Sequence, residues 1–174
     1  SSLGANTTGD GNVGSGYQAL YTNTTGTKNT ASGYQALYTN LTGSFNVAIG
    51  DSALYTNETG NSNTAVGKSA LKTNSTGSYN TAFGYRALDG NTTGSNNVAV
   101  GSDTGSAVTT GSNNTAIGRE ALYKVTTQSD NTAIGRAALA NTRASYNTAI
   151  GSQALQENTT GANNSALGYR ALYN

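Results

Sequence analysis

Short apolar stretches recur along the whole chain at a fixed spacing, and a glycine closes each of them. The stretch TGSNNTAIGREAL, residues 110–122, returns in close variants such as NSNTAVGKSAL, SYNTAFGYRAL and ANNSALGYRAL. Successive closing glycines lie 17 residues apart, except Gly135 and Gly151, which lie 16 apart. Such a period is typical of a repeat array, in which each unit buries its apolar face against its neighbours. We expect residues 1–174 to form one such array, a piece of a longer fibrous protein.

The repeat predicts strands rather than helices. Seventeen residues are too few for the helix pairs of helical repeats, and Gly, Asn and Thr are poor helix formers. Short apolar stretches bounded by turn residues predict strands. One repeat is long enough for a coil of two short strands and two turns, and ten coils stacked at about 4.8 Å give a rod about 48 Å long. The predicted fold class is all-β: a β-solenoid (parallel β-roll) of about ten 17-residue coils.

Three columns of residues have structural roles in this interpretation. The closing glycine suits a tight bend where a Cβ is excluded. The block NTTG, or a relative of it, suits the opposite turn, although its Asn-X-Ser/Thr sequences are also N-glycosylation acceptors. An asparagine four residues before each closing glycine is expected to form a ladder between coils, as amides do in cross-β structures. This column comprises Asn12, Asn29, Asn46, Asn63, Asn80, Asn97, Asn114, Asn131, Asn147 and Asn164.

Apolar residues are expected on both faces of the coil. Neighbouring side chains of a strand point to opposite faces, so Ala116 and Ile117 would lie on opposite sides. Ala121 and Leu122 would do the same if that segment were extended. One set can fill the interior, which leaves the other as a long apolar stripe of the kind that marks an interface. We expect side-by-side association of identical chains. The alternative is a monomer whose bulges bring Ile and Leu to one side.

The repeated NTAIG, NVAIG and NTAVG resemble the head repeats of trimeric autotransporter adhesins, whose signature runs like NSVAIG, and repeats of bacteriophage tail fibres. All ten units carry the motif. The resemblance implies a homotrimer of parallel β-rolls that serves as a stiff projecting head and adheres to host surfaces.

The amino-acid composition argues against most kinds of catalytic and metal-binding site. The chain has no His, Cys, Met, Trp or Pro, and its net charge is +1. Without Cys there are no disulfides or thiolates, and scattered charges give no footprint for nucleic acid. No apolar run is long enough to cross a bilayer. GDGNVG at residues 9–14 matches a dinucleotide-binding pattern but belongs to a turn block, and the carboxylates do not align in a column. We expect no enzyme, no catalytic, cofactor or metal site, and no membrane insertion within this segment.

Tyrosine often follows the closing glycine, at Tyr17, Tyr34, Tyr85 and Tyr169. Such a row offers ring area and a polar hydroxyl for binding sugars or proteins, and it can equally well cover a sheet edge.

The leading hypothesis is a structural or adhesive segment of an extracellular, cell-surface or virion fibre, whose partners are itself and a surface glycan or protein of a host. One alternative is an ice- or surface-binding solenoid, suggested by the column Thr22, Thr39, Thr56 and Thr73, which ends at Gly90. Another is a subunit of an end-to-end filament, because the ends of a solenoid are open sheet edges.

Overall fold

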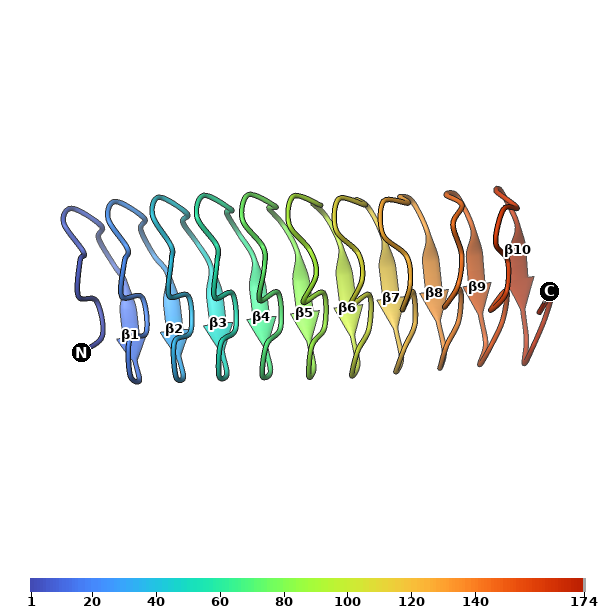
Figure 1. Ribbon diagram of the computed structural model, residues 1–174, viewed down its shortest axis with the longest axis horizontal. Helices are drawn as coiled ribbons and strands as arrows, with labels where there is room; N and C mark the ends of the chain where they lie inside the picture. Colours follow the sequence, from blue (N-terminus) through green and yellow to red (C-terminus); the bar gives the residue numbers. More distant parts are fainter. Residues whose placement is uncertain (174) are drawn as a thin grey trace.

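The chain is a β-solenoid whose coils stack in a single row, as the computed structural model shows for residues 1–173 (Figure 1). Each coil contributes one strand of three residues to a parallel sheet of ten strands, in chain order. Residues 1–173 contain no helix, and hence none long and apolar enough to span a membrane. The strands are β1 (Val13–Ser15), β2 (Thr30–Ser32), β3 (Val47–Ile49), β4 (Thr64–Val66), β5 (Thr81–Phe83), β6 (Val98–Val100), β7 (Thr115–Ile117), β8 (Thr132–Ile134), β9 (Thr148–Ile150) and β10 (Ser165–Leu167).

The sheet pairs equivalent residues of successive repeats. Ala116 of β7, for example, lies opposite Ala133 of β8. The shortened repeat keeps the same pairing, with Thr132 opposite Thr148. Its missing residue falls in the turn after Thr142, since Ser129 still donates from its backbone to the hydroxyl of Ser145. A one-residue change inside a strand would reverse every following side chain, whereas the turn absorbs it.

The second side of each coil has no strand, so the prediction of two strands per coil is wrong. Two residues of each coil on this side adopt left-handed conformations, such as Gln35 (φ 50°) and Leu37 (φ 53°), which interrupts the extended backbone. Their N–H groups still bond to neighbouring coils. Gln35 donates back to the carbonyl of Tyr17 at 2.8 Å, and Leu37 donates forward to Ala53 at 2.9 Å. The backbone groups are therefore satisfied without a regular ladder.

Alanine and leucine fill the interior. The central alanine of nearly every strand is buried, and so are both residues of the Ala-Leu pair that follows the bend in most coils. Ala121 and Leu122 thus share the inside of the coil, contrary to the expectation for an extended segment, because Leu122 has φ 53°. Where Gly105 replaces the leucine, Leu88 and Val108 pack into the space beside it.

The closing glycines make a bend that no other residue fits. Gly50 has φ 133°, a conformation that L side chains rarely adopt. A Cβ at Gly50 would lie 2.6 Å from the carbonyl oxygen of Gly67 in the next coil. Conformation and close stacking therefore both exclude a side chain here, which explains why the glycine recurs in every repeat.

Candidate functional site

The asparagine column expected to form a ladder lies inside the rod and ties each coil to the next through backbone groups. The backbone N–H of Asn46 donates to the Oδ1 of Asn29 at 2.9 Å, and the Nδ2 of Asn46 donates to the carbonyl of Gly60 at 2.8 Å. The same arrangement recurs in most coils. The amides of this column therefore bond chiefly to main-chain groups of neighbouring coils. A cross-β ladder would require bonds between the amides themselves, and these are rare in this column. Their role in the structure is to hold coils in register.

A ladder of amide-to-amide bonds does occur, in the asparagines of the NTTG block. The Nδ2 of Asn40 donates to the Oδ1 of Asn23 at 2.6 Å, and that of Asn57 donates to Asn40 at 2.9 Å. Asn23, Asn40 and Asn57 are fully buried, so an oligosaccharide cannot be attached to them in the folded rod. Sequence reasoning assigned this column to turn chemistry. Val108 and Val125 in the same column were the signal that it faces the interior.

This second ladder stops at Asn91. The next residue in the column is Val108, which has no amide, and the buried Oδ1 of Asn91 has no hydrogen-bond partner among the described residues. The column continues with Val125 and Thr142, both buried. The rod therefore changes there from a polar to a mainly apolar seam.

The outward face of the sheet carries two parallel rows of side chains. The first residue of most strands is a half-buried Thr or Val, and the third is an apolar residue that points to solvent. From β3 onward the third residues are Ile49, Val66, Phe83, Val100, Ile117, Ile134, Ile150 and Leu167, which we call the outer stripe. Six of its members are about two-fifths exposed or more, such as Ile49 at 43 % and Ile117 at 39 %. In β1 and β2 the same position holds Ser15 and Ser32, so the stripe is confined to later coils.

The structure brings two of the four candidate tyrosines together and separates the others. Tyr17 and Tyr34 stack at 5.4 Å between ring centroids, with 12° between their planes. Tyr85 follows them in the column only after Asp51 and Lys68, and Tyr169 lies at the other end of the array beside Arg170. A second stack consists of Tyr21, Tyr38 and Tyr55. Its ring centroids are 5.6 Å apart between Tyr21 and Tyr38 and 5.1 Å apart between Tyr38 and Tyr55. Both stacks lie in the first coils of the chain.

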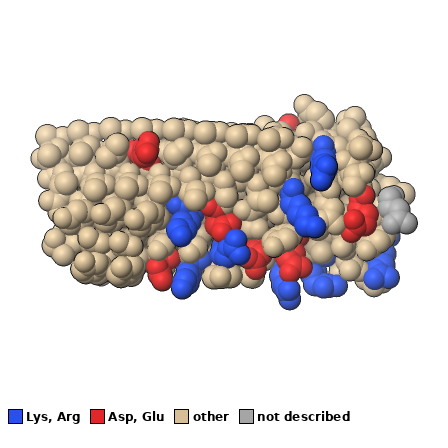
Figure 2. Space-filling model, viewed as in Figure 1, with Lys and Arg blue, Asp and Glu red and all other residues tan. Residues whose placement is uncertain are grey.

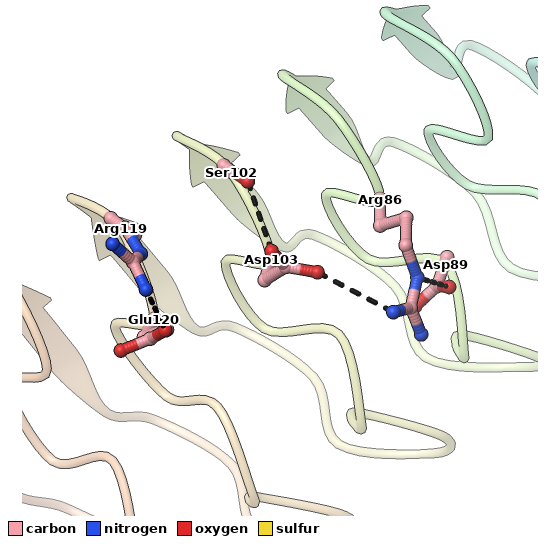
Figure 3. A network of polar contacts seen from close by, with 6 residues as sticks. All are labelled: Arg86, Asp89, Ser102, Asp103, Arg119 and Glu120. Carbon is pink, nitrogen blue, oxygen red and sulfur yellow. Dashed lines mark hydrogen bonds and ion pairs between the residues drawn. The ribbon is translucent and has the colours of Figure 1, made fainter.

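Charged side chains gather away from those first coils. On the face shown in Figure 2 they lie mainly over the middle and later coils. Figure 3 shows a chain of contacts there: Arg86 donates to Asp89 at 2.8 Å and approaches Asp103 of the next coil at 3.6 Å. The hydrogen bond to Asp89 raises the pKa of Arg86 above its ordinary value. Arg119 pairs with Glu120 at 2.7 Å, and all these groups are solvent-accessible. Such pairs contribute at most about 1 kcal/mol each.

Within the described part of the chain there is no pocket and no cluster of three metal-ligating side chains. The hydroxyls of the threonine column, expected to form a surface array, donate instead to carbonyls of the next coil, as Thr22 does to Tyr38 at 2.7 Å. The accessible features are therefore surfaces: the outer stripe and the tyrosine stacks.

Comparisons of this chain with protein-family models, with curated proteins and with solved structures found no match.

Proposed function

We propose that this chain is a non-enzymatic structural segment of an extracellular, cell-surface or virion fibre, in which three copies associate side by side. The observation that carries the proposal is the outer stripe. The interior is already filled by alanine and leucine, so the stripe lies outside the core of the chain. A continuous row of exposed apolar side chains that is not used internally is typical of an interface.

Lateral association of parallel copies suits the geometry of the stripe. Equivalent side chains are in register along the rod, as Ile117 is with Ile134 and Ile134 with Ile150. Copies related by an axis parallel to the rod would bring identical stripes together at every height, which is a closed symmetric arrangement. Three copies are favoured over two by the resemblance of the repeats to trimeric adhesin heads.

A stiff rod suits a fibre because its identical coils can each contribute the same weak contact to a partner surface. Weak contacts along many coils, multiplied by three chains, gain strength through avidity without any deep pocket. The bonds between coils, from backbone and asparagine side chains, run through the entire array and support its stiffness.

Charge placed on the stripe tests the proposal. Ile117→Asp combined with Ile150→Asp puts carboxylates on the outward face, where each coil can still fold because neither side chain is in the interior. We expect the double variant to sediment as a monomer with an unchanged circular dichroism spectrum, since like charges would meet at the interface. Ser15→Asp combined with Ser32→Asp is the matched control, in the same row outside the stripe, and should stay trimeric. An equal loss of assembly in both variants, or in neither, would refute the role of the stripe.

A second candidate uses the same face differently. Thr64, Thr81 and Thr115 lie beside the stripe on a regular parallel sheet, which is the arrangement a flat ice- or surface-binding face requires. The two functions exclude one another, because an interface between copies would cover the threonines. A monomeric chain that inhibits ice recrystallisation would favour this candidate.

A further inference from the structure

The first coils carry a surface that the fibre role does not use. We name it the tyrosine comb: Tyr17, Tyr34, Gln18 and Gln35, with the stacked row Tyr21, Tyr38 and Tyr55, of which Tyr55 lies one coil further along. Tyr17 and Tyr34 are 58 % and 52 % exposed, so their rings are accessible to a ligand. Their coils hold Ser15 and Ser32 in place of the outer stripe. Apart from Tyr55, whose coil holds Ile49, the comb therefore lies where the apolar interface residues are missing.

The comb is ordered before any ligand arrives. The rings of Tyr17 and Tyr34 are nearly parallel, and those of Tyr21 and Tyr38 differ by only 4°. Stacking between coils restricts the rotamers of these side chains, so little conformational entropy remains to be lost on binding. Tyrosine also supplies a large contact area with only two side-chain torsions, which is why binding surfaces favour it.

Amide groups accompany the rings. Gln35 donates through Nε2 to the Oε1 of Gln18 at 2.8 Å. This bond leaves the amide nitrogen of Gln18 and the amide oxygen of Gln35 without a partner among the described residues. This one pair of coils thus offers one neutral donor and one neutral acceptor in the coils that carry the stacked rings.

The surroundings of the comb are almost uncharged. The only charged side chains in residues 1–50 are Asp10 and Lys28, and Lys28 lies over the ring of Phe45. Asp51 follows Tyr34 in the tyrosine column, and its carboxylate is paired with Lys68 of the next coil at 3.6 Å. Figure 2 shows the same contrast between this end of the rod and the charged later coils. A surface with little net charge offers little attraction to an ionic polymer, whereas ring edges, phenol hydroxyls and amides can contact the C–H groups and hydroxyls of a neutral sugar.

We propose that the tyrosine comb binds an uncharged polysaccharide that lies along the rod axis. Its repeated rings, 5.1–5.6 Å apart, present similar contacts to successive sugar units. Three combs in one trimer would add avidity. The inference rests on the adhesive part of the proposed function and gives it a ligand class.

Affinity electrophoresis in native gels tests the inference, with hydroxyethylcellulose and galactomannan as neutral probes and alginate as the acidic comparator. We expect at least one neutral polymer to retard the protein and alginate not to. Tyr17→Ala combined with Tyr34→Ala should weaken that retention about tenfold or more, as removal of a central aromatic pair does at binding surfaces. Both rings are exposed, so the melting temperature should hardly change.

Tyr85→Ala combined with Tyr169→Ala is the matched control, because these tyrosines occupy the same column without a stacked partner. It should bind like the unchanged protein. The inference is overturned if no neutral polymer retards the protein, if only alginate does, or if both double variants weaken binding equally. The solution mass of the protein distinguishes the two proposals. A trimer that neither neutral polymer retards would refute only the binding of polysaccharide by the tyrosine comb. A monomer that a neutral polymer retards would refute only the trimeric fibre.

Discussion

At the scale of single residues, this fold stabilises conformations that are normally unfavourable. Leu37, Leu54 and Leu71 all have φ near 50°. A left-handed residue costs about 1–2 kcal/mol for a side chain with a Cβ. Each of these leucines is fully buried, and burial of a leucine contributes about 1.5–3 kcal/mol. The burial offsets the backbone cost once per coil, which explains why the leucine column is so regular.

The buried amide ladder yields a prediction about single substitutions. Asn57→Val removes the only side-chain donor to the buried Oδ1 of Asn40. An unsatisfied buried acceptor costs about 1–3 kcal/mol, so we expect the free energy of unfolding to fall by that amount. Chemical denaturation monitored by circular dichroism measures it.

Asn91→Val is the control for that substitution. The Oδ1 of Asn91 is already unsatisfied, and the carbonyl of Gly94 keeps its bond from Asn80. The substitution removes the donor to the Oδ1 of Asn74, and it also removes the unsatisfied Oδ1 of Asn91 itself. The number of buried acceptors without a hydrogen bond therefore stays the same. We expect a change below about 1 kcal/mol. Equal losses at Asn57 and Asn91 would contradict the account of the ladder.

At the scale of the coil, the strand side could be predicted from the sequence and the opposite side could not. The alternation of Ala116 and Ile117 identifies which residue enters the core, because a strand has a period of two. The Ala-Leu segment has no such period, since left-handed residues alternate with others there. Nothing in Ala121 or Leu122 themselves announces that conformation. The two-strand coil was therefore wrong, although the parallel stacking and the 17-residue repeat were confirmed.

The candidate surfaces were only partly foreseen for a related reason. The apolar stripe follows from the strand period, and the tyrosine column is visible in the sequence. The stacking of Tyr17 on Tyr34, and the isolation of Tyr85 and Tyr169, depend on which residues occupy neighbouring coils. The buried ladder of Asn23, Asn40 and Asn57 resembled ordinary turn residues, because asparagine suits both environments.

The coil also predicts where the chain tolerates a deletion. The natural 16-residue repeat lacks one residue in its outer turn and keeps its strand register. We expect deletion of Thr76, in the equivalent turn, to leave the circular dichroism spectrum unchanged and to lower the melting temperature only moderately. Deletion of Ala82, in the middle of β5, should abolish soluble folding because it moves Phe83 into the interior phase. Equal tolerance of both deletions would show that strand register does not govern this fold.

At the scale of the whole molecule, the rod divides its surface between two uses. Coils from β3 onward carry the outer stripe, while the first two coils have no stripe and carry all of the tyrosine comb except Tyr55. Some charged groups of the middle and later coils are paired with one another: Asp51 with Lys68, Arg86 with Asp89 and Asp103, and Arg119 with Glu120. Assembly and adhesion would then belong to different parts of one rigid body.

The solution mass of the unmodified chain tests the central proposal most directly. Light scattering behind a sizing column gives this mass without reference to shape, which matters for a rod. We predict three times the 17.5 kDa of one chain. A mass of 17.5 kDa at concentrations well above the micromolar range would contradict the trimeric fibre and would show that the outer stripe is exposed in the free protein.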